Sequence, residues 1–346
     1  MSEEKSSQQK GFVQTVTGLV APGDLGKTLS HEHLLLDIFP PDQEREPERK
    51  ITLGNLGETR RLWGKNPLNA RLDSEEDAIA ELACFKEAGG GTVVEVTSIG
   101  LKRDPEGLAR ISRATGVHVV MGCSYYVHNY QPEEVKSLSE EEIIASIIGE
   151  IREGVGETGI HAGIIGEVGL FWPVHECEDK VLQASAVAQI ETGAPLMVHP
   201  GRYPEAPMRA IEVVKEAGGD TTRTIMAHID RTLFDRDDMF ALADTGCILE
   251  FDLFGHESSF YYPAPIDMPN DALRIDHIQA LIAAGYGGQL LVSHDICHKH
   301  RLIRYGGDGY AHLLNNVAPI MARKGMSEQE INALFIDNPA RILAFA

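Results

Sequence analysis

The sequence contains few of the features that mark secreted or membrane-spanning proteins. Its five cysteines are far apart and form no CxxC pair, so neither a disulfide framework nor a zinc knuckle is expected. No apolar run approaches the ~18 residues that a membrane-spanning helix requires. The first ten residues, MSEEKSSQQK, are polar and lack the apolar segment of a secretion signal. We therefore expect a cytoplasmic protein without membrane association and with a disordered tail at residues 1–10.

Positive charge is also scarce. The 346 residues include 31 Lys and Arg against 52 Asp and Glu, a formal net charge of −21. This balance argues against the basic surface that a nucleic-acid partner requires. It does not exclude a small anionic substrate, because a few arginines at a pocket can override the net field of the protein.

Short apolar runs alternate with longer amphipathic segments from about residue 28 onward. This alternation indicates parallel strands joined by helical crossovers. Several runs are apolar throughout, as expected for strands that are covered on both faces. Eight strands are predicted, at Thr28–Asp37, Gly91–Thr97, His118–Ser124, Gly163–Val168, Pro195–His199, Thr224–His228, Cys247–Asp252 and Gln289–Ser293.

Some of the intervening helices have recognisable N-terminal caps. A serine stands three positions before a carboxylate in the pairs Ser74/Asp77, Ser139/Glu142 and Ser327/Glu330. No linker rich in Gly, Ser or Pro divides the chain. We predict an α/β protein in which residues 11–346 form a single (β/α)8 TIM barrel with a short N-terminal β extension. An open doubly wound sheet is the alternative, but no Gly-rich phosphate fingerprint follows the first strand.

The first predicted strand, TLSHEHLLLD, carries two histidines in an otherwise apolar run. Because side chains alternate across a strand, His31 and His33 project the same way. A single buried histidine is more often a hydrogen-bonded core residue than a metal ligand. Two in one apolar strand are harder to explain as packing, since each must satisfy two ring nitrogens away from water.

Other predicted strands end in residues of the same kind: Glu167, His199, His228 and Asp295. In a barrel the C-terminal strand ends meet on the one face where active sites form. The four imidazoles and two carboxylates are donors suited to zinc, manganese, iron or cobalt. A structural zinc site usually takes four closed ligands, often thiolates, so six donors without cysteine favour two divalent cations with open positions. Glu167 can then bridge the two cations.

At these residues the chain resembles the phosphotriesterase family of the amidohydrolase superfamily, from about Val13 to Phe345. The motifs that carry the resemblance include KTLSHEHL at 27–34, IIGEVG at 164–169, VHPGR at 198–202, AHIDRT at 227–232 and SHDICHKHRLIRYGGDGYAH at 293–312. The segments EFDLFG at 250–255 and PIDMPND at 265–271 are similar to sequences of the animal branch of that family.

The resemblance implies roles for the six residues. His31, His33 and Asp295 would hold one metal, His199 and His228 the other, and Glu167 would bridge them. The better-known phosphotriesterases bridge with a carbamylated lysine at this position, so the sequence departs from their pattern at Glu167. A tyrosine near the bridging water in lactonase relatives matches Tyr126. Asp295 is the expected proton carrier between the attacking water and the leaving amine, and a role as metal ligand alone is the alternative.

The animal branch is similar to hydrolases of N-acetyltaurine and related N-acyl amino acids, which implies a small anionic N-acyl substrate. Arg202 and Arg231, placed just after His199 and His228, are candidates to bind its anion, and a salt bridge at the barrel rim is the alternative for each. His298 belongs to a basic cluster, His298–Arg301, that either attracts the anion or is a solvated loop. Phe254, Tyr261 and Tyr262 lie in a Pro-rich stretch that resembles a lid.

Two other functions remain open from the sequence. The same metals could serve lactone or phosphoester hydrolysis, which begins from the same activated hydroxide. The barrel could also be catalytically silent and bind a metabolite. A homodimer is compatible with the sequence but is not indicated by any motif.

Overall fold

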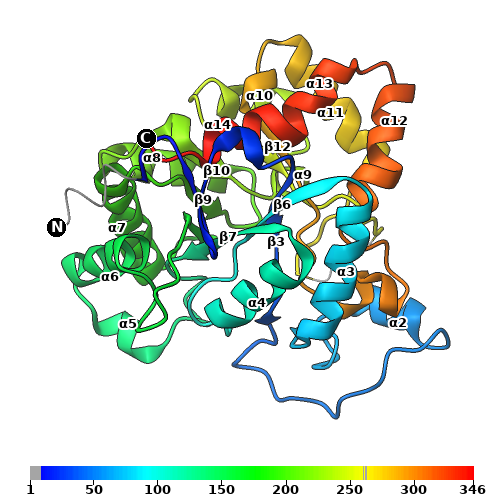
Figure 1. Ribbon diagram of the computed structural model, residues 1–346, viewed down its shortest axis with the longest axis horizontal. Helices are drawn as coiled ribbons and strands as arrows, with labels where there is room; N and C mark the ends of the chain where they lie inside the picture. The colour runs from blue at the N-terminus through cyan, green and yellow to red at the C-terminus, as the bar shows by residue number, and fades with distance from the viewer. Residues whose placement is uncertain (1–8, 260, 262) are drawn as a thin grey trace.

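A computed structural model describes residues 9–259, 261 and 263–346, and Figure 1 shows its ribbon. Eight parallel strands form one sheet in the order β12-β11-β10-β9-β8-β7-β6-β3. Their bounds are β3 (Lys27–Glu32), β6 (Gly90–Glu95), β7 (His118–Cys123), β8 (Ile164–Gly169), β9 (Leu196–His199), β10 (Thr224–Met226), β11 (Ile248–Phe251) and β12 (Leu290–Val292). All eight predicted strands are therefore present.

The first and last strands of this sheet approach one another and close it into a barrel. The Ser30 hydroxyl donates to the Val292 carbonyl oxygen (3.1 Å), and the Asp295 N–H donates to the His31 carbonyl oxygen (3.2 Å). The predicted (β/α)8 fold is confirmed. The first strand was expected to reach Asp37 but ends at Glu32, after an irregular register with β6.

The chain beyond Glu32 forms a separate two-stranded sheet. In it β4 (Leu36–Asp37) pairs antiparallel with β5 (Arg71–Leu72). The segment between them holds α2 (Leu56–Arg61) and a long exposed loop, visible in blue at the bottom of Figure 1. This excursion lies on the side of the barrel where the strands end.

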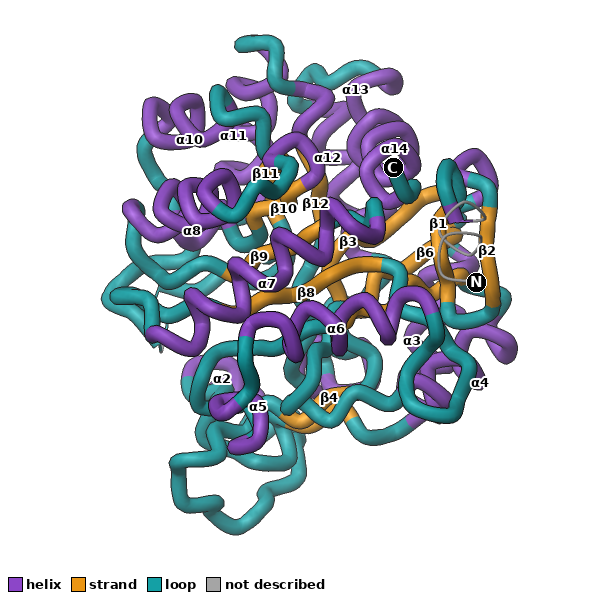
Figure 2. Tube along the Cα trace, turned by 90° about the vertical axis from the view of Figure 1, so that its left-hand side faces the viewer, coloured by secondary structure: helices purple, strands orange, loops and turns teal. Residues whose placement is uncertain are grey.

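Helices surround the sheet, and in Figure 2 α6, α7 and α8 are seen passing across its outer face. Long crossovers of this kind are what parallel neighbouring strands require. The helices after α2 are α3 (Glu75–Glu87), α4 (Pro105–Thr115), α5 (Glu133–Ser137), α6 (Glu140–Arg152), α7 (Glu176–Thr192), α8 (Glu205–Glu216), α9 (Ile229–Thr232), α10 (Arg236–Ala243), α11 (Asp271–Ala283), α12 (Ala318–Arg323), α13 (Glu328–Asn332) and α14 (Asn338–Leu343).

The three predicted serine caps are present. Ser139 and Ser327 form full capping boxes with Glu142 and Glu330, because each glutamate also accepts the N–H of its serine. Ser74 accepts the N–H of Asp77 at the start of α3. These caps fix where α3, α6 and α13 begin.

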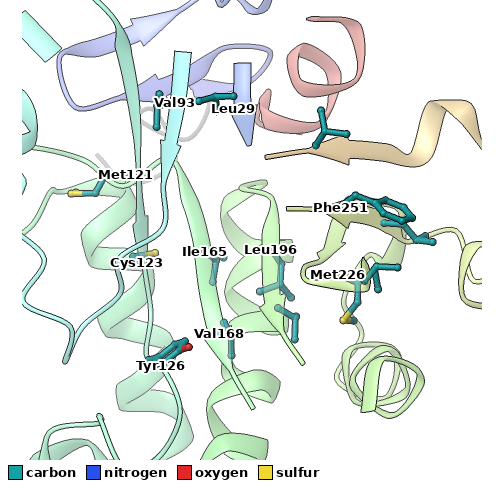
Figure 3. Close-up of a cluster of buried hydrophobic side chains, with 14 of the residues drawn as sticks. Leu29, Val93, Met121, Cys123, Tyr126, Ile165, Val168, Leu196, Met226 and Phe251 are labelled. Atoms are coloured by element: carbon teal, nitrogen blue, oxygen red, sulfur yellow. The ribbon is translucent and has the colours of Figure 1, made fainter. Parts of the chain in front are cut away.

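The hydrophobic core has two layers, which follow from the alternation of side chains along each strand. One layer fills the barrel interior with residues such as Val94, Met197 and Leu291. The other packs between strands and helices, and Figure 3 shows Val93, Leu196 and others of this layer. Polar ligand-type residues replace the inner layer only toward the C-terminal strand ends.

A β-hairpin, β1 (Val13–Thr15) and β2 (Gly18–Val20), forms the expected N-terminal extension. It lies at the N-terminal ends of the barrel strands, where the Val16 N–H donates to the Val119 carbonyl oxygen (2.9 Å). Of the expected tail, residues 1–8 lie outside the described residues. Gln9 is buried and its amide donates to the Ile151 carbonyl oxygen.

None of the helices described is both long and apolar enough to cross a membrane.

Stability should depend on the layer between strands and helices. Phe251 on β11 is fully buried, whereas Phe12 is 43 % exposed. We expect Phe251→Ala to lower the free energy of unfolding by about 3–5 kcal/mol, because a large cavity replaces the ring. Phe12→Ala, the control, should change it by less than about 0.5 kcal/mol. Chemical denaturation of both variants provides the measurement, and equal losses would contradict the assignment of the core.

Candidate metal centre

The first group of ligand-type side chains lies where β3 meets β12. His31 is near the end of β3, His33 follows that strand, and Asp295 follows β12. Asp295 Oδ1 is 3.2 Å from His33 Nε2 and 3.7 Å from His31 Nε2. Both histidines are buried, and the Asp295 side chain is 16 % exposed. The three donors thus face one space that opens on the side of Asp295.

The second group of ligand-type side chains lies at the ends of the neighbouring strands β9 and β10. His199 ends β9, and His228 follows β10 and precedes α9. Their imidazoles meet edge to face, with His228 Nε2 2.8 Å from His199 Nδ1. Both side chains are buried.

Glu167 on β8 lies between the two groups. Its Oε2 atom is 2.8 Å from His199 Nδ1 and 3.4 Å from His228 Nε2. Its Oε1 atom is 3.5 Å from His33 Nε2. One carboxylate therefore offers an oxygen to each group, and the structure brings together all six side chains that the sequence singles out.

The carboxylates at this centre are ionised in spite of their burial. Burial opposes the charge of Glu167, but the imidazoles of His199 and His31 hold its pKa well below the usual range. Burial likewise opposes the charge of Asp295, and His33 beside it lowers the pKa of that carboxyl. Burial and the neighbouring His228 lower the pKa of His199, which favours a neutral imidazole. Burial opposes protonation of His31, His33 and His228 too, but the carboxylates beside them raise the pKa of all three. Metal binds ionised carboxylates and neutral imidazoles, so a cation bound here would displace any proton that these three rings carry.

Two of the six residues have unusual backbone conformations. His228 has φ 55° and Asp295 has φ 50°, both in the left-handed region that non-glycine residues seldom adopt. Each lies at the point where the chain leaves a strand. Such strain costs on the order of 1–3 kcal/mol and persists where the surrounding structure enforces it, commonly at functional sites.

Further polar residues orient the imidazoles from behind. Asp252, which follows β11, places Oδ1 2.8 Å from His228 Nδ1 and Oδ2 3.1 Å from His31 Nδ1. Thr97 places its hydroxyl 2.8 Å from His33 Nδ1. These partners occupy the ring nitrogens that face away from the centre, which is the arrangement that fixes ligating histidines in metal sites.

The geometry fits divalent cations. The Nε2 atom of His31, the ring nitrogen that faces the centre, is buried without a hydrogen-bond partner among the described residues. With metal–ligand bonds of about 2.0–2.2 Å, donors that share a tetrahedral cation lie roughly 3.3–3.6 Å apart. The His31 Nε2 to Glu167 Oε2 distance of 3.6 Å and the His33 Nε2 to Glu167 Oε1 distance of 3.5 Å are too long for hydrogen bonds but match that spacing.

A cavity of about 290 Å³ adjoins the centre at His199. Residues from several strand-end loops line it, among them Asp42, Trp63, Tyr126, Asn129, Tyr130, Phe171, Arg202 and His298. A larger hollow of about 590 Å³ lies on the flank between α8 and α10. We regard the smaller cavity as the substrate site, since it adjoins the converging donors.

Tyr126 lies between this cavity and the second group of ligands. Its hydroxyl is 3.4 Å from His199 Nδ1, and the two rings meet edge to face. Burial, together with the charge of Glu167, raises the pKa of Tyr126 well above its usual value. The phenol therefore keeps its proton and can donate a hydrogen bond into the cavity.

Arg202 is the cation of the cavity. Its Nε donates to the Tyr261 hydroxyl (3.3 Å), and its guanidinium lies 5.9 Å from the centre of that ring. Burial opposes its charge, but the phenol oxygens of Tyr261 and Tyr126 raise its pKa. No carboxylate pairs with it in the part of the chain that the structure describes.

Arg231 is placed differently from the expectation. It does not line the cavity, and it is only 2 % exposed. Its guanidinium lies 3.1 Å from His199 Nε2 and donates to the Pro200 carbonyl oxygen. In the structure it therefore packs against the imidazole of His199 and not against the cavity.

His298 lines the cavity but does not bring charge to it. Its ring packs edge-on against Trp63, with centroids 4.5 Å apart. Burial lowers the pKa of His298 to about 3, so the ring is neutral. Lys299 in the same cluster is engaged with Asp73 at 2.7 Å. The cluster His298–Arg301 is thus a packed turn, and of the expected lid Tyr262 lies outside the described residues.

Sequence reasoning missed several residues of the site. Asp252 stands at a strand end like the ligands, and this position could have identified it. Glu250, on β11, is buried with its Oε2 atom 3.5 Å from His31 Nδ1, and burial raises its pKa. Trp63, Asp42 and Asn129 lie in loops without periodic pattern, so no signal in the sequence indicated them.

Comparison with known proteins agrees with this geometry. The sequence model described as "Phosphotriesterase family" matches residues 11–343. The chain is 43 % identical to a phosphotriesterase-related protein of Nematostella vectensis over 97 % of this chain and 99 % of that one. It is also 43 % identical to the N-acetyltaurine hydrolase of Bos taurus, over 98 % of this chain and 99 % of that one.

Among solved structures, a resiniferatoxin-binding protein of Rhodobacter sphaeroides superposes with a TM-score of 0.91 at 36 % identity. The match covers 96 % of this chain and 95 % of that one. The chain is therefore a hydrolase that belongs to the phosphotriesterase family.

Proposed function

We propose that the protein is a binuclear-metal hydrolase that cleaves the amide bond of N-acetyltaurine or a related N-acyl amino acid. The observation that carries this proposal is the convergence of six ligand-type side chains, with Glu167 between them, beside a cavity that contains the cation Arg202. The relatives named N-acetyltaurine hydrolase support an amide substrate that ends in a sulfonate.

In this proposal His31, His33 and Asp295 would hold one metal, His199 and His228 would hold the other, and Glu167 would be the ligand shared by both. We expect zinc, although manganese, iron and cobalt suit the same nitrogen and oxygen donors. When bound, two such ions lower the pKa of a water toward neutrality and polarise a carbonyl group.

The residues of the chain then position the substrate and move its protons. Tyr126 keeps its phenolic proton and directs it toward the cavity, where it can donate to the substrate carbonyl oxygen. Asp295, ionised and partly exposed, accepts a proton from the attacking water and passes it to the leaving amine. Trp63 and Phe171 line the apolar walls that exclude solvent.

Arg202 supports an anionic substrate. A guanidinium without a paired carboxylate among the described residues needs a negative charge from elsewhere, because leaving a partly buried charge unpaired is costly. Its planar fork suits a sulfonate or a carboxylate.

We also propose a cytoplasmic location, because all five cysteines are free thiols, as expected in a reducing compartment.

Replacing the proton carrier should separate chemistry from metal binding. Asp295→Asn keeps an oxygen ligand but removes the base, so we expect kcat to fall by about 10²–10⁴-fold while metal content changes far less. Steady-state kinetics on N-acetyltaurine and metal analysis of the same preparation give the two readouts. A matched control is Asp276→Asn, on the outer helix α11, where the carboxylate pairs with Lys324. Normal kcat in fully metallated Asp295→Asn would reject the role.

Replacing the cavity cation should affect anionic substrates selectively. A charge-assisted hydrogen bond contributes about 1.5–3 kcal/mol, so Arg202→Gln should lower kcat/KM for N-acetyltaurine roughly 10- to 150-fold. The kcat/KM for the uncharged N-ethylacetamide should fall only slightly, because this substrate has no anion to bind. Arg209→Gln on α8, whose arginine pairs with Glu212 outside the cavity, serves as the control. A substrate panel that shows lactone or phosphotriester turnover but no amide turnover would contradict the proposed function itself.

A further inference from the structure

The cavity beside the metal centre contains two charges of opposite sign. Arg202 and Asp42 both line it. Tyr130 also lines the cavity, and both charges affect its phenol. Burial raises the pKa of Tyr130 and the Asp42 charge raises it further, whereas the Arg202 charge lowers it. The two charged groups therefore act on the same part of the cavity wall.

Asp42 has no cationic partner among the described residues. It lies in the loop between β4 and α2, where Arg45, Glu48 and Arg49 form ion pairs and Glu44 and Glu46, like Asp42, form none among the described residues. Asp37 pairs with Arg45 and Lys102, and Glu48 pairs with Arg71. The arginines of the same loop are thus already engaged, and Asp42 is left as an exposed carboxylate in the lining of the cavity.

An unpaired carboxylate is unfavourable in a site that binds only an anion, because like charges repel. The arrangement becomes favourable when the substrate brings a cation as well. Asn129 offers a second acceptor, since its side-chain oxygen is buried and has no hydrogen-bond partner among the described residues. An ammonium group has three donors and no acceptor, so a carboxylate and an amide oxygen are the partners that it requires.

We propose that the protein also hydrolyses zwitterionic amides, in which the acyl part carries a free ammonium group and the amine part carries a sulfonate or carboxylate. This inference rests on the proposed function. Asp42 and Asn129 bind the ammonium group, and Arg202 binds the anion. A cavity of about 290 Å³ is at the lower end of small-molecule sites, which suits a ligand of dipeptide size.

The reaction is a simple hydrolysis. The oxygen of one water forms a bond to the acyl carbon, and the carbon–nitrogen bond of the amide breaks. One proton of the water passes to the leaving nitrogen. The products are a free amino acid and an amino sulfonate or second amino acid, and no oxidant or further reactant is needed.

The test compares two substrates that differ only in charge. Glycyltaurine and propionyltaurine have the same number of heavy atoms, but only the first carries an ammonium group. With the metal-loaded enzyme at pH 7 we expect kcat/KM for glycyltaurine to exceed that for propionyltaurine by roughly tenfold. Asp42→Asn should abolish this preference, lowering the glycyl value and raising the propionyl value by relief of repulsion.

Glu44→Gln is the matched control, because Glu44 is exposed in the same loop and does not line the cavity. It should leave both kcat/KM values unchanged. Failure to cleave glycyltaurine, or an equal preference in the wild type and in Asp42→Asn, would overturn the inference. If propionyltaurine is still cleaved in that case, the proposed function stands, whereas loss of turnover of all acyl taurines would overturn both.

Discussion

A single buried carboxylate, that of Glu167, faces imidazoles that come from β3, β9 and β10 and their ends. Removing a carboxylate from water costs several kcal/mol unless opposite charges or hydrogen bonds offset the loss. Here His199 lies close enough to hydrogen-bond, while His31, His33 and His228 stand at distances that suit a shared cation better than a hydrogen bond. The imidazoles at the surrounding strand ends thus offset the cost of burying the charge of Glu167.

The barrel supplies that arrangement through its topology. Parallel strands end on one face, so residues as far apart as His31 and Asp295 become neighbours once β3 and β12 meet. The left-handed backbone at His228 and Asp295 turns both side chains toward the centre, and Asp252 holds two imidazoles from behind. The loops that follow the same strand ends then build the cavity, whose lining includes Arg202, Asp42 and several aromatic side chains.

Much of the fold, and the convergence of six ligand-type side chains, followed from the sequence, because both depend on local patterns. Apolar runs marked the eight strands, and polar residues at the ends of apolar runs marked the six side chains that converge. The first strand ended early because its register with β6 is irregular near His31, a detail that periodicity does not encode. The direction of Arg231 depends on the turn that begins at His228, and the neutrality of His298 depends on burial against Trp63. A binding role for Asp42 could not be predicted from the sequence, because the residues that line the cavity with it are distant in the chain.

The metal content of the purified protein tests the central claim most directly. The protein should be produced with zinc, manganese or cobalt in the medium, dialysed against metal-free buffer and analysed by mass spectrometry of its metals. Convergence of the six donors predicts about two divalent ions per chain. A chain that retains none, even after reconstitution with each of these metals, would contradict the account.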